Sequence, residues 1–210
     1  MKVSLNFFTN FILRKILKKK VKKMKRIYLD NAATTPLSEE VIDAMVSVMK
    51  ETFGNPSSTH SIGQEAKVLI ENVRRQVADY LHVSPAEIIF TSCGTESNNM
   101  IIKSCVENLG VERIITSPME HKCVAETVLD MKKNRGTEVT FLRPNKKGDF
   151  DLSKLEELLK SSDKKTLVTL MHANNEIGNL IDLKKVAEIC KENNALFHSD
   201  TVQSMAHMDL

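Results

Sequence analysis

The carboxylate of Asp200 is the group in this sequence best placed to do chemistry. It directly follows a strand-like run over 195–199, and an acid at the carboxyl end of a buried strand stands where α/β folds bind their ligands. A buried aspartate needs a cationic partner or several hydrogen bonds to stay ionised. A protonated ring nitrogen would meet that need. The alternative is that Asp200 only caps the turn or helix that follows it.

Gly94 and Thr95 form a second candidate binding segment. They follow the apolar run 88–90 and open a predicted helix over 95–109. The free amides at a helix N-terminus carry roughly half a positive charge, which suits a phosphate ester. The simpler alternative is an ordinary helix cap, made by Ser92 or Thr95.

Two further polar segments also follow predicted strands. His121 opens the helix after strand 113–116, where its flat ring could stack on a planar ligand; a surface or core histidine is the alternative. His121 and Cys123 without further ligands do not predict a metal site. Asn175 follows strand 166–171, and its amide can donate to or accept from a ligand oxygen, although the same residues would also form a turn.

Strands and helices that could position these residues alternate along the chain. Predicted strands cover 88–90, 113–116, 138–142, 166–171 and 195–199, and predicted helices cover 95–109, 121–134, 152–161 and 182–193. A strand-like segment beginning at Ile27 and two amphipathic helices, one following Ser38 and one reaching Leu81, precede them. This alternation predicts an α/β fold, a mainly parallel sheet with helices on both faces. All four candidate segments would then lie at the carboxyl edge of one sheet.

Charge is divided unevenly along the 210 residues. Of the 30 basic and 27 acidic residues in the chain, residues 1–26 hold ten basic ones and no acidic one. Residues 27–210 therefore hold 20 basic and 27 acidic residues, a net charge of −7. An acidic body with few aromatic residues excludes a nucleic-acid-binding surface. The basic extension, 1–25, is expected to be disordered or a non-native start, the alternative being a helix on an anionic membrane surface. Its apolar stretch is too short for a transmembrane segment.

The four cysteines do not form a recognisable framework. Cys93, Cys105, Cys123 and Cys190 lack the short spacing of a zinc or redox pair. So few cysteines in a chain of this length indicate reduced thiols in a cytoplasmic protein rather than secreted disulfides.

Six segments, taken together and in order, resemble NifS/IscS-like cysteine desulfurases, pyridoxal 5'-phosphate (PLP) enzymes of the class V aminotransferase group with fold type I. The segments are 28–36, 53–58, 91–97, 120–122, 171–178 and 198–204. The resemblance implies that the PLP phosphate binds at Gly94 and Thr95 and that the pyridine ring lies between His121 and Asp200, the acid pairing with the ring nitrogen. It also implies that the phenolic oxygen contacts Asn175 and Gln203. Cys93 stands where the family usually has glycine.

The resemblance also implies an activity. Such enzymes convert L-cysteine to L-alanine and move the sulfur to an enzyme thiol, for iron–sulfur cluster or thio-cofactor synthesis; they are homodimers that serve sulfur-acceptor or scaffold proteins. The family's PLP lysine and sulfur-accepting cysteine lie beyond Asp200 and have no counterpart in this sequence. Residues 26–210 are therefore expected to be an incomplete PLP-binding large domain without activity of its own. The alternatives are a non-catalytic fragment or paralogue, a selenocysteine lyase, or a different aminotransferase.

Overall fold

The computed structural model describes residues 26–208, so the predictions for 1–25 lie outside it. The chain divides after Pro36 into two units. In the first unit, the amide of Ala33 donates to the carbonyl of Asp30 over 3.1 Å, which closes a turn. The strand expected from Ile27 is wrong, because residues 26–30 are irregular and pair with no strand of the described chain.

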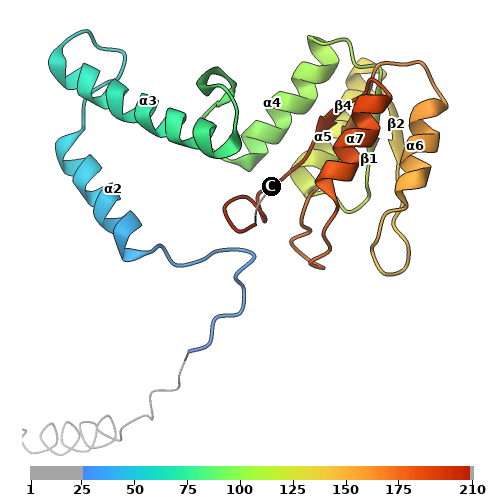
Figure 1. The fold of residues 1–210 in the computed structure, drawn as a ribbon, viewed down its shortest axis with the longest axis horizontal. Coiled ribbons are helices and arrows are strands. Elements are labelled where there is room, and N and C mark those ends of the chain that lie inside the picture. Colours follow the sequence, from blue (N-terminus) through green and yellow to red (C-terminus); the bar gives the residue numbers. More distant parts are fainter. Residues whose placement is uncertain (1–25, 209–210) are drawn as a thin grey trace, which may run out of the picture. The chain divides into compact units, whose positions relative to one another are not determined.

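The second unit is built on one parallel sheet. Its strands are β1 (Arg113–Thr116), β2 (Glu138–Phe141), β3 (Thr166–Thr169) and β4 (Leu196–His198), in the order β2-β1-β3-β4 (Figure 1). Ile114 of β1 lies opposite Val139 on one side and Leu167 on the other. All three strand pairs are parallel, which confirms the predicted α/β fold.

Three helices of the described chain precede the first strand and three connect the strands, and they begin close to the predicted positions. They are α2 (Glu39–Glu51), α3 (Ser61–Leu81), α4 (Gly94–Glu107), α5 (Lys122–Arg135), α6 (Leu152–Lys160) and α7 (Leu183–Glu192). Asp151 and Asp182 cap α6 and α7 by accepting a backbone N–H in the first turn. Among the described residues, none of the helices is both long and apolar enough to cross a membrane.

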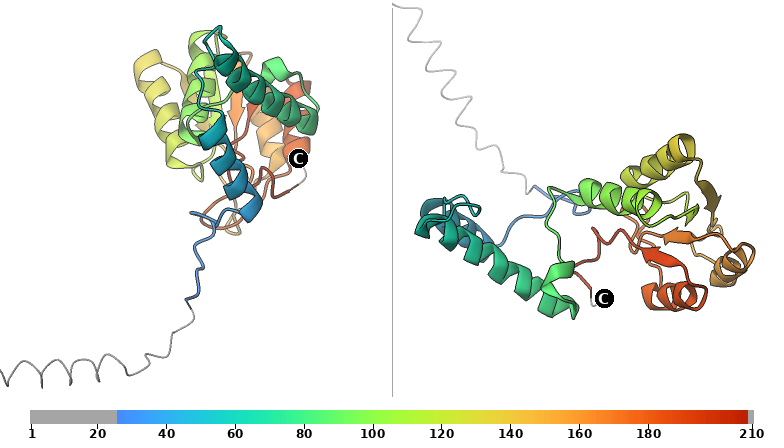
Figure 2. Two further views of the ribbon diagram at one scale, coloured as in Figure 1. Left: turned by 90° about the vertical axis from the view of Figure 1, so that its left-hand side faces the viewer. Right: turned by 90° about the horizontal axis from the view of Figure 1, so that it is seen from above.

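Helices lie on both faces of the sheet, as Figure 2 shows in the view from above, and each face buries its own apolar cluster. Ile114 and Leu167 pack with residues of α4 and α5, such as Ile102 and Val128. Their neighbours along the strands point the other way, so Ile115 belongs to the cluster of α6 and α7. Helices therefore cover both faces, as predicted, and the loops at the strand ends remain the accessible edges of the sheet.

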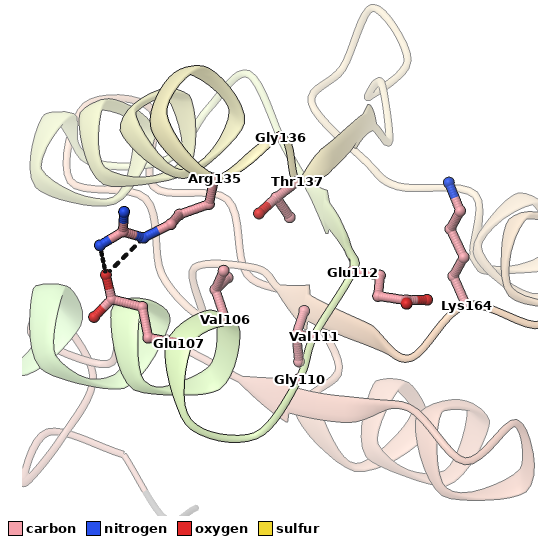
Figure 3. Close-up of a pocket in the computed structure, with 9 residues that line it drawn as sticks. All are labelled: Val106, Glu107, Gly110, Val111, Glu112, Arg135, Gly136, Thr137 and Lys164. Atoms are coloured by element: carbon pink, nitrogen blue, oxygen red, sulfur yellow. Dashed lines mark hydrogen bonds and ion pairs between the residues drawn. The ribbon is translucent and has the colours of Figure 1, made fainter.

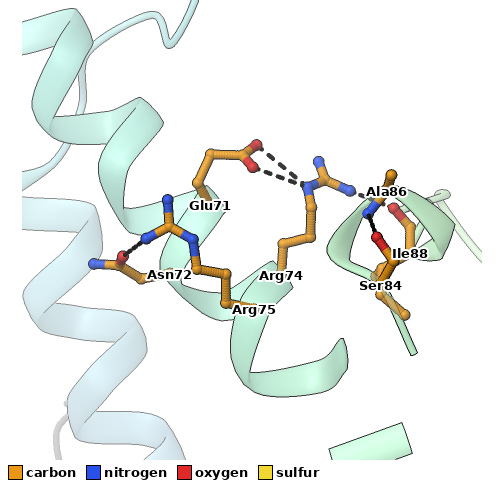
Figure 4. A network of polar contacts seen from close by, with 7 residues as sticks. All are labelled: Glu71, Asn72, Arg74, Arg75, Ser84, Ala86 and Ile88. Carbon is orange, nitrogen blue, oxygen red and sulfur yellow. Dashed lines mark hydrogen bonds and ion pairs between the residues drawn. The ribbon is translucent and has the colours of Figure 1, made fainter. Parts of the chain in front are cut away.

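The strand predicted over 88–90 is wrong. These residues have no strand partner in the described chain, and the side chain of Ile89 is 63% exposed. Arg74 of α3 holds the segment instead (Figure 4). Its guanidinium pairs with Glu71 at 3.2 Å, donates to the carbonyl of Ile88, and lies 4.8 Å from the ring centre of Phe90. The apolar run thus leads to α4 as an irregular connection anchored on a helix.

We expect the two-sided core to be the main source of stability. Ile115→Ala should lower the free energy of unfolding by about 2–5 kcal/mol, because the fully buried side chain leaves a cavity between the sheet and α6–α7. Ile177→Ala, at a side chain 57% exposed, should change it by less than about 0.5 kcal/mol. Urea unfolding followed by circular dichroism measures both. Equal losses would contradict the assignment of Ile115 to the core.

Candidate functional site

The carboxylate of Asp200 lies just beyond β4 and is only 5% exposed. Its Oδ2 accepts a hydrogen bond from the Nδ2 amide of Asn98 on α4 at 2.8 Å, and its Oδ1 accepts from the backbone N–H of Val202 at 3.0 Å. Its own carbonyl accepts from the backbone N–H of His172, beyond β3, at 3.0 Å. Asp200 is therefore tied to three parts of the fold, and each carboxylate oxygen has a donor.

The N-terminus of α4 lies beside this turn. A Cβ built on Gly94 would come within 2.8 Å of Cγ2 of Val202, closer than carbon atoms pack, so glycine permits the close approach. Cys93 is the N-cap residue of α4, and its side chain makes no capping hydrogen bond to the helix. The backbone N–H of Glu96, followed by the hydroxyl of Ser92, lowers the pKa of the Cys93 thiol. Backbone N–H groups at a helix N-terminus favour a negative charge in this way, and Thr95 is exposed beside them.

His121 caps α5, as its ring nitrogen accepts from the backbone N–H of Cys123 at 3.2 Å. The ring itself is exposed. Thr95 and His121 line the same open pocket of about 670 Å³ between the two helices. The structure thus brings together the predicted phosphate segment at the start of α4 and the predicted stacking residue at the start of α5.

The loop after β3 joins the same edge. The Nδ2 amide of Asn174 donates to the carbonyl of Met119 at 2.8 Å, which fastens this loop to the one that carries His121. Its neighbour Asn175 is half-buried. Gln203 is half-buried on the turn after Asp200. All four predicted segments therefore meet at the carboxyl edge.

Three polar residues with a part in this edge were not predicted from the sequence. Asn98 holds Asp200 and also donates to Sγ of Cys123 at 3.3 Å. Ser204 and His172 share a buried hydrogen bond of 2.8 Å, which fastens the turn after β4 to the end of β3. Asn98 lies four residues after Gly94, one turn along the same helix face, and this spacing was the available signal.

A second pocket lies at the opposite edge of the sheet, where the strands begin (Figure 3). It has a volume of about 760 Å³ and is lined by residues that precede β1, β2 and β3, among them Gly110, Thr137 and Lys164. At its side Arg135 donates to Glu107 at 2.6 Å. No candidate segment reaches it, so the chemistry predicted from the sequence belongs to the carboxyl edge alone.

The comparisons with known proteins point to one family. The aminotransferase class-V family model matches residues 27–210. Cysteine desulfurase IscS of Dictyoglomus turgidum is 44% identical over 188 residues, which cover 88% of this chain and 47% of that protein. The mitochondrial cysteine desulfurase of Saccharomyces cerevisiae is 42% identical over 88% of this chain and 37% of its own length. The chain thus spans about half the length of the curated relatives it matches, or less.

Solved structures give the same picture. A NifS-like protein superposes with a TM-score of 0.82 at 39% identity, covering 88% of this chain and 51% of that one. The structure titled "SspA in complex with cysteine" has a TM-score of 0.81 at 33% identity and the same coverage of this chain, with 53% of its own. Class-V aminotransferases and cysteine desulfurases are PLP enzymes.

The residues at this edge fit that cofactor. A helix terminus that favours negative charge suits the phosphate. The buried Asp200, whose donors Asn98 and Val202 N–H are uncharged, suits a protonated ring nitrogen. The exposed ring of His121 leaves one face available for stacking.

Asn98 should prove to be a structural anchor of Asp200. Asn98→Ala should lower the free energy of unfolding by about 1–3 kcal/mol, because Oδ2 of a buried carboxylate loses its donor. Asn99→Ala is the matched control, since that amide only bonds the carbonyl of Thr95 at the helix surface. Asn99→Ala should change the free energy of unfolding by less than about 0.5 kcal/mol, and urea unfolding measures both variants. A smaller loss for Asn98 than for Asn99 would contradict the anchoring role.

Proposed function

Because the chain belongs to the aminotransferase class-V family, we propose that it forms the PLP-binding part of a cysteine desulfurase. This enzyme would take sulfur from L-cysteine and leave L-alanine. The observation that carries the proposal is the buried Asp200, held by Asn98 beside the glycine-led N-terminus of α4. The relatives named cysteine desulfurase, at 42–44% identity, support the choice of reaction.

Gly94 and Thr95 would hold the phosphate of the cofactor. The amides at the start of α4 point out of the helix toward an anion, and the hydroxyl of Thr95 adds one more donor. The absence of a Cβ at Gly94 keeps this terminus close to the turn that carries Asp200. The two ends of the cofactor would then be bound by segments that already touch each other.

Asp200 and His121 would hold the ring. Asp200 would accept a hydrogen bond from the pyridine N–H and keep that proton in place, since an ionised acid in a poorly hydrated site favours the charged partner. His121 would stack on the ring face and exclude water from it. Asn175 and Gln203 would orient the phenolic oxygen through their amides, which accept or donate according to its charge.

When bound, PLP supplies an electron-accepting ring that stabilises negative charge at the α-carbon of an amino acid. The residues of this chain would contribute orientation and an acceptor for the ring proton. Asp200 would keep that proton on the ring nitrogen, and its two existing donors hold the carboxylate against rotation. Preorganised charge of this kind lowers the barrier because it needs no rearrangement during the reaction.

L-cysteine as substrate, a sulfur-acceptor or scaffold protein as partner, a homodimeric enzyme and a cytoplasmic location complete the proposal. Iron–sulfur cluster assembly is the process that the name IscS of several relatives suggests. A selenocysteine lyase or another class-V enzyme is the competing assignment. Comparing L-cysteine with L-selenocysteine as substrate separates the two, because a lyase of that kind would release alanine from the selenium compound alone.

A chimera tests the function directly. Residues 27–208 would replace the matching segment of the Dictyoglomus turgidum enzyme, which is 44% identical. We expect alanine production from L-cysteine. Asp200→Ala in this chimera should lower the rate at least about a hundredfold, or roughly 2.7 kcal/mol, while much of the bound PLP is retained.

Asp43→Ala is the control, because this carboxylate is exposed on α2. It should leave alanine production unchanged. A chimera with the PLP absorbance of the parent enzyme but no alanine production would contradict the desulfurase assignment. Near-normal alanine production by Asp200→Ala would show that Asp200 has a structural role and none in the reaction.

A further inference from the structure

Glu120 stands directly before His121, and its carboxyl group points into the protein. Its Oε1 accepts two hydrogen bonds, one from the hydroxyl of Ser117 at 2.6 Å and one from the backbone N–H of Met171 at 3.1 Å. The first donor lies in the same loop after β1 and the second at the end of β3. Glu120 therefore bridges two neighbouring strand ends through one oxygen.

The other oxygen, Oε2, is buried and has no hydrogen-bond partner among residues 26–208. Burial raises the pKa of Glu120 to about 7, against the lowering effect of the bonds from Ser117 and Met171. The negative charge of Asp200 also raises this pKa, by a smaller amount. Because Oε1 already accepts both bonds, the proton belongs on Oε2, where no acceptor role is lost.

Few charged groups surround this carboxyl. Asp200, on the turn after β4, is the charged residue that acts on it across the sheet edge. Three histidines also lie at this edge: His121 on the same loop, His172 after β3 and His198 at the end of β4. The remaining ionisable groups are Lys122 and Cys123 at the start of α5, Cys93 and Glu96 at the start of α4, and Glu176 in the loop after β3. For His172 and His198 burial lowers the pKa, which favours their neutral forms. No lysine or arginine is among the groups that shift Glu120.

We infer that Glu120 is a positioning residue of the site: as a neutral acid it fixes the loop that carries His121 to the end of β3 without adding a second negative charge beside Asp200. The cofactor part of this inference rests on the proposed function. The bond from Asn174 to the carbonyl of Met119 is the second tie between the same two segments. A carboxylate would make the bridge equally well, but two like charges at one poorly hydrated edge repel each other.

The neutral state has a thermodynamic signature that needs no cofactor. The folded chain keeps the Glu120 proton up to about pH 7, whereas the unfolded chain releases it near its ordinary value of 4.5. The contribution of Glu120 to the free energy of unfolding is fully present below about pH 4.5. It is lost as the pH rises from there to about 7. At its centre, the unfolding equilibrium constant should rise close to tenfold per pH unit, relative to a side chain that cannot ionise.

The first experiment compares the full chain with Glu120→Gln in urea unfolding between pH 5 and 8, without PLP. Gln keeps an oxygen for Ser117 and Met171 but carries no proton to lose. The variant should gain stability over the unaltered chain as the pH rises and level off above about 7. Glu157→Gln, at an exposed carboxyl on α6, should track the unaltered chain throughout. Parallel profiles for Glu120→Gln and the unaltered chain would overturn the neutral state.

The second experiment tests positioning, by titrating PLP into the same proteins and into Glu120→Ala at pH 7.5. We expect Glu120→Gln to bind as the unaltered chain does and Glu120→Ala to bind at least about tenfold more weakly. The alanine leaves the Met171 N–H without its acceptor, and the His121 loop then keeps one of its two ties to the end of β3. Equal binding by Ala and Gln variants would overturn the positioning role. An unaltered chain that binds no PLP would overturn the proposed function and the cofactor link, while the pH profile still decides the state of Glu120.

Discussion

The carboxyl edge of the sheet depends on one buried charge. Asp200 is removed from solvent, and a carboxylate in that position is tolerated only when its oxygens are satisfied. Asn98 reaches it from α4 and Val202 N–H from its own turn. These bonds set the distance between the helix that would hold an anion and the turn that carries the acid. A ligand with a phosphate at one end and a protonated nitrogen at the other would complete the arrangement.

Parallel pairing explains why residues so far apart in sequence converge. Each strand of β1, β3 and β4 ends at the same edge, so the loops with His121, Asn175 and Asp200 become neighbours. The fold and this convergence could be predicted, because apolar strands alternate with amphipathic helices and polar residues follow the strands. The predicted segment at Gly94 is at the same edge for a different reason. It starts α4, which packs on the sheet, although no strand precedes it among residues 26–93.

The remaining features depend on tertiary contacts that local patterns do not carry. Residues 88–90 have the composition of a strand, yet they pair with Arg74 and not with a neighbouring strand. Arg74 donates a hydrogen bond to the carbonyl of Ile88 and lies over the ring of Phe90. Asn98 looks like any polar residue on a helix until Asp200 is placed opposite it. Glu120 was read as part of a motif with His121, but its inward carboxyl is set by the amide of Met171, which a sequence does not locate. Such residues act through other residues, and their roles follow from the structure.

We propose that the four segments form one cofactor site. Amide hydrogen–deuterium exchange of the full chain, with and without saturating PLP, measures this for every segment at once. We expect slower exchange in all four segments, 94–98, 119–123, 172–176 and 199–204, and no change around the pocket at the opposite edge, at 110–112 and 136–137. Protection at the opposite edge, or in one segment alone, would contradict the claim.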